Sequence, residues 1–205
     1  LQKELGISNR RHSLEFEIDF THVDNPIETP YEPISRPHTD EELWIDAFLD
    51  KVQFDRSEHV LGSNYLDDLK RFNHEQRVTN GTDWAVTMFV VDSSDDADHH
   101  FADSRIAYAQ LGGPHLVLPL VNGSALPIDD LGMVAAHELG HLFWALDEYP
   151  LGGDAYNAFS GYYNTQNKNA AVGQPDPASR EPSIMAELAL QLSLIHISEP
   201  TRRRH

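Results

Sequence analysis

Residues 129–149, DDLGMVAAHELGHLFWALDEY, constrain this chain more than any other stretch, because they predict a helix that carries the pattern HExxH. His137 and His141 are four residues apart, so an α-helix places both imidazoles on one face, where they can bind one metal ion. Glu138 lies beside the first histidine and is suited to act as general base toward a water at that metal. The chemistry that these residues support is hydrolysis, and the expected substrate is a peptide bond.

The predicted helix is strongly apolar, which argues against the simpler interpretation of two solvated histidines on a surface helix. Its apolar residues include Val134, Ala135, Leu139, Leu142, Phe143 and Leu146. A helix of this kind is largely buried, and imidazoles on a buried helix need polar partners. A metal ion is the simplest partner for two imidazoles at this spacing, and zinc is the expected ion.

Length and composition narrow the class of protein. A chain of 205 residues can bury one sizeable core, so a single domain with a small N-terminal addition is expected. The net charge of −18 argues against a nucleic-acid partner. The absence of cysteine leaves His, Asp and Glu as the strong metal ligands. No apolar run approaches the roughly 20 residues of a membrane span, and the chain starts without Met or a signal peptide, so we expect a fragment.

Residues 1–38 are predicted to form an N-terminal strand followed by a linker. Residues 13–20 alternate apolar and acidic side chains, which indicates a half-buried strand. Residues 25–37 contain four prolines, which remove backbone donors and favour an extended segment along the surface.

Two helices are predicted after the linker. Thr39 begins a capping-box pattern, and apolar residues at helical spacing follow to about Phe54. The second helix should begin near Ser63 and end before Asn80-Gly81, a turn dipeptide.

Three strands are predicted between these helices and the HExxH helix. Residues 84–91 form a continuous apolar run, which indicates a central strand buried on both faces. Residues 105–111 and 115–121 should form two more strands, and Pro119 suits an edge strand. An edge strand just before the HExxH helix can pair with an extended substrate, and the residues expected to do so are His115, Leu116, Val117 and Leu118. The alternative, given equal weight, is that the proline protects the edge strand from aggregation and marks no substrate site.

Two loops are predicted around the HExxH helix. The acidic residues of 92–104 either wrap a calcium ion or form a solvated loop, because the glycine of the EF-hand pattern is absent. The carboxylates concerned are Asp92, Asp95, Asp96, Asp98 and Asp103. After the helix, Gly152-Gly153 and the polar residues 156–169 are expected to form a loop.

The run HELGHLFWALDEY, followed by Ser183-Ile184-Met185, resembles the metzincin clan of zinc peptidases, whose pattern is HExxHxxGxxH/D with a downstream methionine turn. The ending in DEY is most similar to bacterial secreted peptidases of the immune inhibitor A and IgA-peptidase kinds. The resemblance implies an α/β (α+β) fold in which a mixed twisted sheet with an antiparallel edge strand packs against the HExxH helix. The resemblance covers roughly residues 84–185, and it implies an extracellular location, Asp147 as third zinc ligand and Met185 in the methionine turn. We place the metallopeptidase domain at residues 39–191 and expect it to be truncated at its C-terminal end.

Trp144 stands where the metzincin pattern has the glycine that ends the helix. A continuing helix would carry Asp147 about 9 Å along the axis and about 240° around it from His141, out of reach of the metal. Ligation by Asp147 therefore requires a turn near residues 144–146. The alternatives for the third ligand are Glu148 and, in a gluzincin-like arrangement, Glu181 or Glu187. Met185 is alternatively an apolar gap-filler.

Two classes of function remain open on the sequence alone. The first is a zinc endopeptidase that acts on extended polypeptide. The second is a non-catalytic binding or surface module that keeps a peptidase-like metal site. Glu138 and a set of three ligands favour the enzyme, since a structural zinc site has four protein ligands.

The last residues of the chain are set apart from this interpretation. Residues 192–202, LSLIHISEPTR, resemble the in-frame translation of a sequencing adaptor, so residues 192–205 are expected to be foreign to the natural protein. The alternative is a genuine amphipathic tail.

Overall fold

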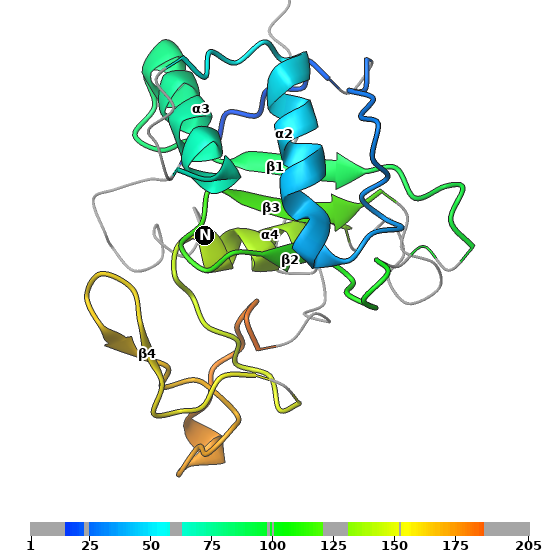
Figure 1. Cartoon of the computed structure of the whole chain (residues 1–205). Coiled ribbons are helices and arrows are strands. Elements are labelled where there is room, and N and C mark those ends of the chain that lie inside the picture. The colour runs from blue at the N-terminus through cyan, green and yellow to red at the C-terminus, as the bar shows by residue number, and fades with distance from the viewer. Residues whose placement is uncertain are drawn as a thin grey trace, which may run out of the picture.

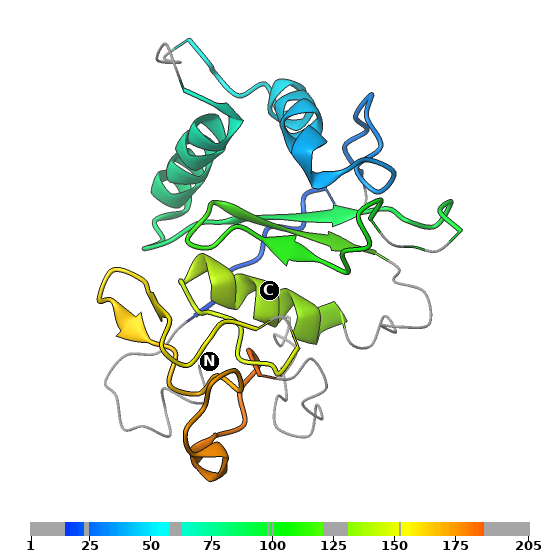
Figure 2. The same ribbon diagram turned by 60° about the horizontal axis from the view of Figure 1, so that its bottom comes forward.

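The structure is a computed structural model that describes residues 15–22, 25–57, 63–97, 99, 101–120, 131–151 and 153–186. A small three-stranded sheet lies between two helices on one face and a third helix on the other (Figures 1 and 2). The described residues therefore form a mixed α and β domain, which confirms the α+β class. Among these residues, no helix is long and apolar enough to cross a membrane. The predicted division at residues 38 and 191 stays a prediction, and residues 192–205 lie outside the described residues.

Two helices come first in the chain, followed by the three strands of the sheet, helix α4 and a short hairpin. Their bounds are η1 His38–Asp40, α2 Glu41–Lys51, α3 Tyr65–Asn80, β1 Thr87–Val91, β2 Tyr108–Ala109, β3 His115–Pro119, α4 Leu131–Leu142, β4 Phe159–Ser160, β5 Thr165–Gln166 and η3 Pro177–Ser179.

Helix α3 matches the sequence-based prediction closely because its ends carry strong local signals. The side chain of Asn64 accepts from the backbone N–H of Asp67, whose carboxylate accepts from the N–H of Asn64 in return. Gly81 ends the helix in the left-handed conformation, with φ of 65°. The capping box predicted at Thr39 is wrong, because a 3-10 turn precedes α2 and the N-cap Asp40 makes no side-chain capping bond.

The sheet has the order β1-β3-β2, so β3 and not β1 is the central strand. β3 pairs in parallel with β1 and antiparallel with β2. The prediction of a central strand at residues 84–91 is therefore wrong. The apolar run suggested burial on both faces, but Met88 and Val90 of β1 are 45% and 48% exposed.

The prediction that β3 is an edge strand open to substrate is also wrong. All five residues of β3 are buried and both of its edges are paired, so His115, Leu116, Val117 and Leu118 cannot pair with a peptide. Pro119 is tolerated for a local reason. The N–H of Leu120 donates to Val91 in β1, so the nitrogen of Pro119 faces the β2 side, where pairing has already ended at Val117.

The two faces of the sheet bury separate apolar clusters. Helices α2 and α3 cover one face, with Ile45, Leu49, Leu69 and Val117 in the cluster there. Helix α4 covers the other face, where Val134 and Leu142 pack on Leu116 and Leu118 of β3 (Figure 2). Successive side chains of β3 point to opposite faces of the sheet, so this strand contributes residues to both clusters.

Three loop segments complete the description. Residues 15–20 form no strand, and Phe16, Ile18 and Phe20 are more than half exposed, so the strand predicted over 13–20 is wrong for these residues; 13 and 14 lie outside the described ones. Residues 25–37 form no helix or strand, but they are not wholly a surface linker, because the chain turns at 33–36 and Ile34 is buried in the core. Residues 156–169 are not all loop, because β4 and β5 form a short antiparallel hairpin.

Candidate metal centre

Helix α4 ends at Leu142, one residue after His141 and earlier than the predicted limit of residue 149. The N–H of Ala145 donates to Gly140 (3.1 Å) and the N–H of Trp144 donates to His141 (2.9 Å). Trp144 itself has a φ of 67°. This pair of bonds around a left-handed residue is a Schellman motif, the turn that glycine normally supplies. The chain therefore turns where ligation by Asp147 requires it, with tryptophan at the left-handed position.

Packing explains how Trp144 holds this conformation. The left-handed region costs a residue with a side chain roughly 1–2 kcal/mol. The indole covers Gly112, and its Cβ approaches Gly161. Trp144 is 45% exposed; burial of about 100 Å² of an aromatic side chain contributes about 2.5 kcal/mol, which offsets the backbone cost. The hydroxyl of Ser160 also donates to the Trp144 carbonyl.

The turn brings Asp147 back to the two histidines. Its Oδ1 lies 3.1 Å from Nε2 of His137 and 3.4 Å from Nε2 of His141. All three ligand atoms lie within 4.8 Å of one another, and they form the one such group of His, Asp and Glu in the described part of the chain. The side chains are 6%, 14% and 20% exposed, respectively for His137, His141 and Asp147, so the group is largely shielded from water.

Backbone carbonyls fix both imidazoles in the same tautomer. Nδ1 of His137 donates to the carbonyl of Ile184 (2.9 Å), and Nδ1 of His141 donates to the carbonyl of Ala145 (2.8 Å). Because a carbonyl can only accept, the proton of each neutral ring is on Nδ1 and the lone pair is on Nε2. Both lone pairs therefore point toward Asp147, which is the arrangement of metal-binding histidines.

These three atoms fit a zinc ion. Zinc bonds of about 2.0–2.1 Å in a tetrahedron separate neighbouring ligand atoms by about 3.3 Å, close to the distances found here. Oδ1 of Asp147 is buried and accepts no hydrogen bond, so a cation would satisfy it. Two nitrogens and one carboxylate oxygen suit zinc better than calcium or magnesium.

Glu138 is buried beside the three ligand residues but is not one of them. It is 7% exposed. Burial raises the pKa of its carboxyl above the ordinary value. A buried carboxylate with a raised pKa next to a metal site is suited to act as a general base.

Met185 packs against helix α4 at Gly140. A Cβ added at Gly140 would meet Sδ of Met185 at 2.6 Å, so glycine inside HELGH makes room for this side chain. Met185 is 5% exposed and lies in the same turn as Ile184. The carbonyl of Ile184 accepts the hydrogen bond from Nδ1 of His137. The structure thus places Met185, the residue predicted for a methionine turn, against helix α4.

The alternative third ligands do not reach this group. Glu148 is instead tied to its own loop, since its carboxylate accepts from Asn169 (2.6 Å) and its carbonyl accepts from Arg180 (3.0 Å). Glu181 is exposed and is not a member of the group. Glu187 lies outside the described residues.

Sequence reasoning missed the residues that hold the ligand loop. Asn167 donates to the carbonyl of Asp147 (2.9 Å), and the hydroxyl of Tyr149 donates to Oδ2 of Asp147 (3.1 Å). Burial, followed by the charge of Asp147, raises the pKa of Tyr149 to about 12, so the phenol is a proton donor at neutral pH. Position in the DEY motif was the signal available for Tyr149; an asparagine in a polar loop gives none.

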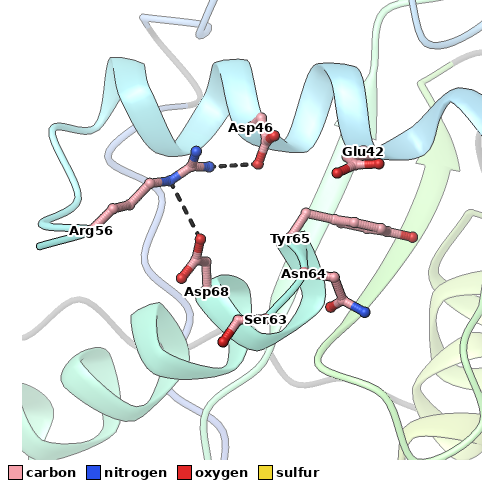
Figure 3. A pocket seen from close by; sticks show the side chains of 7 residues that line it. All are labelled: Glu42, Asp46, Arg56, Ser63, Asn64, Tyr65 and Asp68. Atoms are coloured by element: carbon pink, nitrogen blue, oxygen red, sulfur yellow. Dashed lines mark hydrogen bonds and ion pairs between the residues drawn. The ribbon is translucent and has the colours of Figure 1, made fainter. Parts of the chain in front are cut away.

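Two other acidic regions of the described chain lack a comparable group of metal ligands. In the described part of residues 92–104, the carboxylates of Asp92, Asp95, Asp96 and Asp103 form no group that could hold a metal ion, and Asp98 lies outside it. A polar cavity of about 350 Å³ lies between α2 and α3 (Figure 3). There Arg56 binds Asp46 (2.6 Å) and lies 3.7 Å from Asp68, so the cavity is bridged by ion pairs.

Comparisons of the chain with known protein families, with curated proteins and with solved structures found no match. The arrangement of residues around α4 therefore carries the functional interpretation.

Proposed function

We propose that this protein is a zinc-dependent endopeptidase with a metzincin-like fold. The observation that carries the proposal is the convergence of His137, His141 and Asp147 on one point, with Glu138 buried beside it. The mixed sheet, its antiparallel edge strand β2 and the helix α4 packed below it support the finer fold assignment. The motif resemblance supports an extracellular location.

In this proposal the chain supplies the metal ligands, the general base and the hydrogen bonds that hold the imidazoles in place. His137 and His141 offer Nε2, and Asp147 offers Oδ1, to a zinc ion that would acidify water and polarise a carbonyl group. Three protein ligands leave a fourth position for water and substrate. Glu138 takes the proton from the attacking water and passes it to the leaving amine. The carbonyls of Ile184 and Ala145 keep both imidazoles from rotating.

β2 replaces β3 as the strand proposed to hold substrate. Val117 of β3 turns its N–H and C=O toward Tyr108, so those of Ala109 point away from the sheet. β2 packs against α4 and leads to Gly112, whose N–H donates to the carbonyl of His141 (2.9 Å). An extended polypeptide paired with β2 therefore lies next to the metal ligands.

The decisive experiment combines metal content with proteolysis. The purified wild-type chain should bind one zinc ion per molecule and cleave casein, and a chelator should abolish the cleavage. Glu138→Gln should keep zinc and fold while cleavage falls at least about 100-fold, because the base is lost.

A matched control and the competing outcome make the test sharp. Glu148→Gln alters the next carboxylate along the ligand loop without touching the proposed base, and it should keep cleavage. A wild-type chain that binds zinc tightly but cleaves no unstructured protein would instead support the non-catalytic module. A chain that binds no zinc would remove both proposals.

A further inference from the structure

Tyr149 makes a contact with the ligand group that the proposed mechanism does not use. Its hydroxyl donates to Oδ2 of Asp147 at 3.1 Å, while Oδ1 of the same carboxylate faces the two imidazoles. The ring of Tyr149 lies beside that of His137, with centroids 6.4 Å apart. The phenol therefore holds the oxygen that does not face the metal position.

A free carboxylate can bind a metal through one oxygen or through both. Rotation about the Cβ–Cγ bond interchanges the two oxygens of Asp147, and binding through both would occupy the position left for water. A donor on Oδ2 removes this freedom, because turning the carboxylate breaks the hydrogen bond. The bond also leaves Oδ1 as the one oxygen without a donor.

The backbone on both sides of Tyr149 is fixed, so the hydroxyl has a defined target. The N–H of Asp147 donates to the carboxylate of Asp154 (3.3 Å), and the N–H of Asp154 donates to the carbonyl of Asp147 (3.1 Å). The N–H of Glu148 donates to Met185 (2.9 Å). Gly153 packs so closely on the Tyr149 backbone that a Cβ there would lie 2.3 Å from the Tyr149 carbonyl oxygen.

We propose that Tyr149 is a positioning residue that holds Asp147 as a one-oxygen ligand, so that the metal keeps an open coordination position. This inference rests on the proposed metal centre and assigns Tyr149 no direct part in bond cleavage. Loss of the hydroxyl should weaken metal binding and let the carboxylate bind through both oxygens.

The experiment compares Tyr149→Phe with Tyr162→Phe, which removes the hydroxyl of a tyrosine that is 92% exposed in the same C-terminal segment. Zinc affinity is measured by competition with a chelator, and the coordination number from the visible absorption of the Co²⁺-loaded proteins. Thermal unfolding of the metal-free proteins is recorded in parallel.

We expect Tyr149→Phe to raise the zinc Kd about 10-fold, within the range for residues that orient a ligand. Its Co²⁺ absorption should weaken toward that of a higher coordination number, while Tyr162→Phe matches wild type in both. An unchanged Kd and spectrum would overturn the inference. A fall in metal-free unfolding temperature with an unchanged Co²⁺ spectrum would also overturn it, since the role would then be structural. Failure of wild type to bind zinc would instead overturn the proposed function.

Discussion

The indole of Trp144 fills the space into which a side chain at residue 112 would project. A Cβ at Gly112 would lie 2.2 Å from Cε2 of Trp144, and Gly112 itself has a φ of 66°. The N–H of Gly112 also donates to the carbonyl of His141. Gly112, which follows β2 in the chain, therefore packs directly against the turn at Trp144 that leads to Asp147.

Gly112→Ala should damage the metal centre from a distance. The added methyl group must displace the indole, and alanine is strained at this positive φ, so we expect a loss of at least about 2 kcal/mol of unfolding free energy. Zinc affinity should fall with it, because the turn at Trp144 moves. Gly132→Ala is the control, since a Cβ there meets nothing within 4 Å and alanine favours helix. Urea unfolding and zinc titration check both variants; equal behaviour would contradict the coupling.

Asp147→Ala should abolish tight zinc binding. With two histidines left, we expect the zinc Kd to rise more than about 100-fold, beyond the range for residues that only orient a ligand. Glu148→Ala removes the neighbouring carboxylate, which binds Asn169 and not the ligand group. It should retain measurable zinc. Stoichiometry by elemental analysis distinguishes them, and the reverse order of effects would make Glu148 the ligand.

Ala109→Pro should weaken substrate binding more than folding. The N–H of Ala109 points away from β3, so proline removes no bond of the sheet but takes away a donor for a paired peptide. We expect KM for a casein-derived peptide to rise while the zinc content stays at the wild-type value. Ala109→Val keeps the donor and serves as control. An unchanged KM in the proline variant would exclude pairing of substrate at this position.

Glu41 and His115 form a buried pair on the opposite face of the sheet, with 2.6 Å between Oε1 and Nε2. Burial would raise the pKa of Glu41, but the hydrogen bonds from His115 and Tyr65 outweigh it, so the pKa lies below its ordinary value of 4.5. The folded state then binds fewer protons than the unfolded state around this pH. The stability from Glu41 is present above pH 4.5 and is lost as pH falls through the folded pKa.

Glu41→Gln should therefore cost about 2 kcal/mol at pH 7, as expected when hydrogen bonds to a buried carboxylate are lost. The difference from wild type should shrink as the pH falls below 4.5. Glu42→Gln, at an exposed position of the same helix, should change stability by less than about 0.5 kcal/mol. Urea unfolding in the presence of chelator at several pH values measures this, and a difference independent of pH would contradict the assigned charge.

The helices and the pairing of the two candidate histidine ligands were predictable because local signals determine them. Asn64 and Gly81 mark the ends of α3, and the spacing of His137 and His141 follows from the helical repeat. The reach of Asp147 could be stated only as a condition, since the turn depends on contacts of Trp144 with residues distant in sequence.

The order of the strands could not be predicted in the same way. An apolar run such as β1 does not reveal whether a strand is central. Pro119 does not require an edge strand either, because a proline fits a central strand where its nitrogen faces no paired neighbour. Alternation over residues 15–20 describes a strand only where a partner exists, and those residues are exposed instead. Pairing is a property of the whole fold, so one segment's pattern cannot determine it.

The hydrogen bond from His137 to Ile184 spans 47 residues of sequence, and it has a consequence for the order of events during synthesis. The HExxH helix leaves the ribosome long before the residues that orient its first histidine. A nascent chain that ends between these points carries the motif but has no assembled site. Since Ile184 and Met185 are made after this helix, we expect the proposed hydrolytic activity only after their segment has been synthesised and has packed against Gly140.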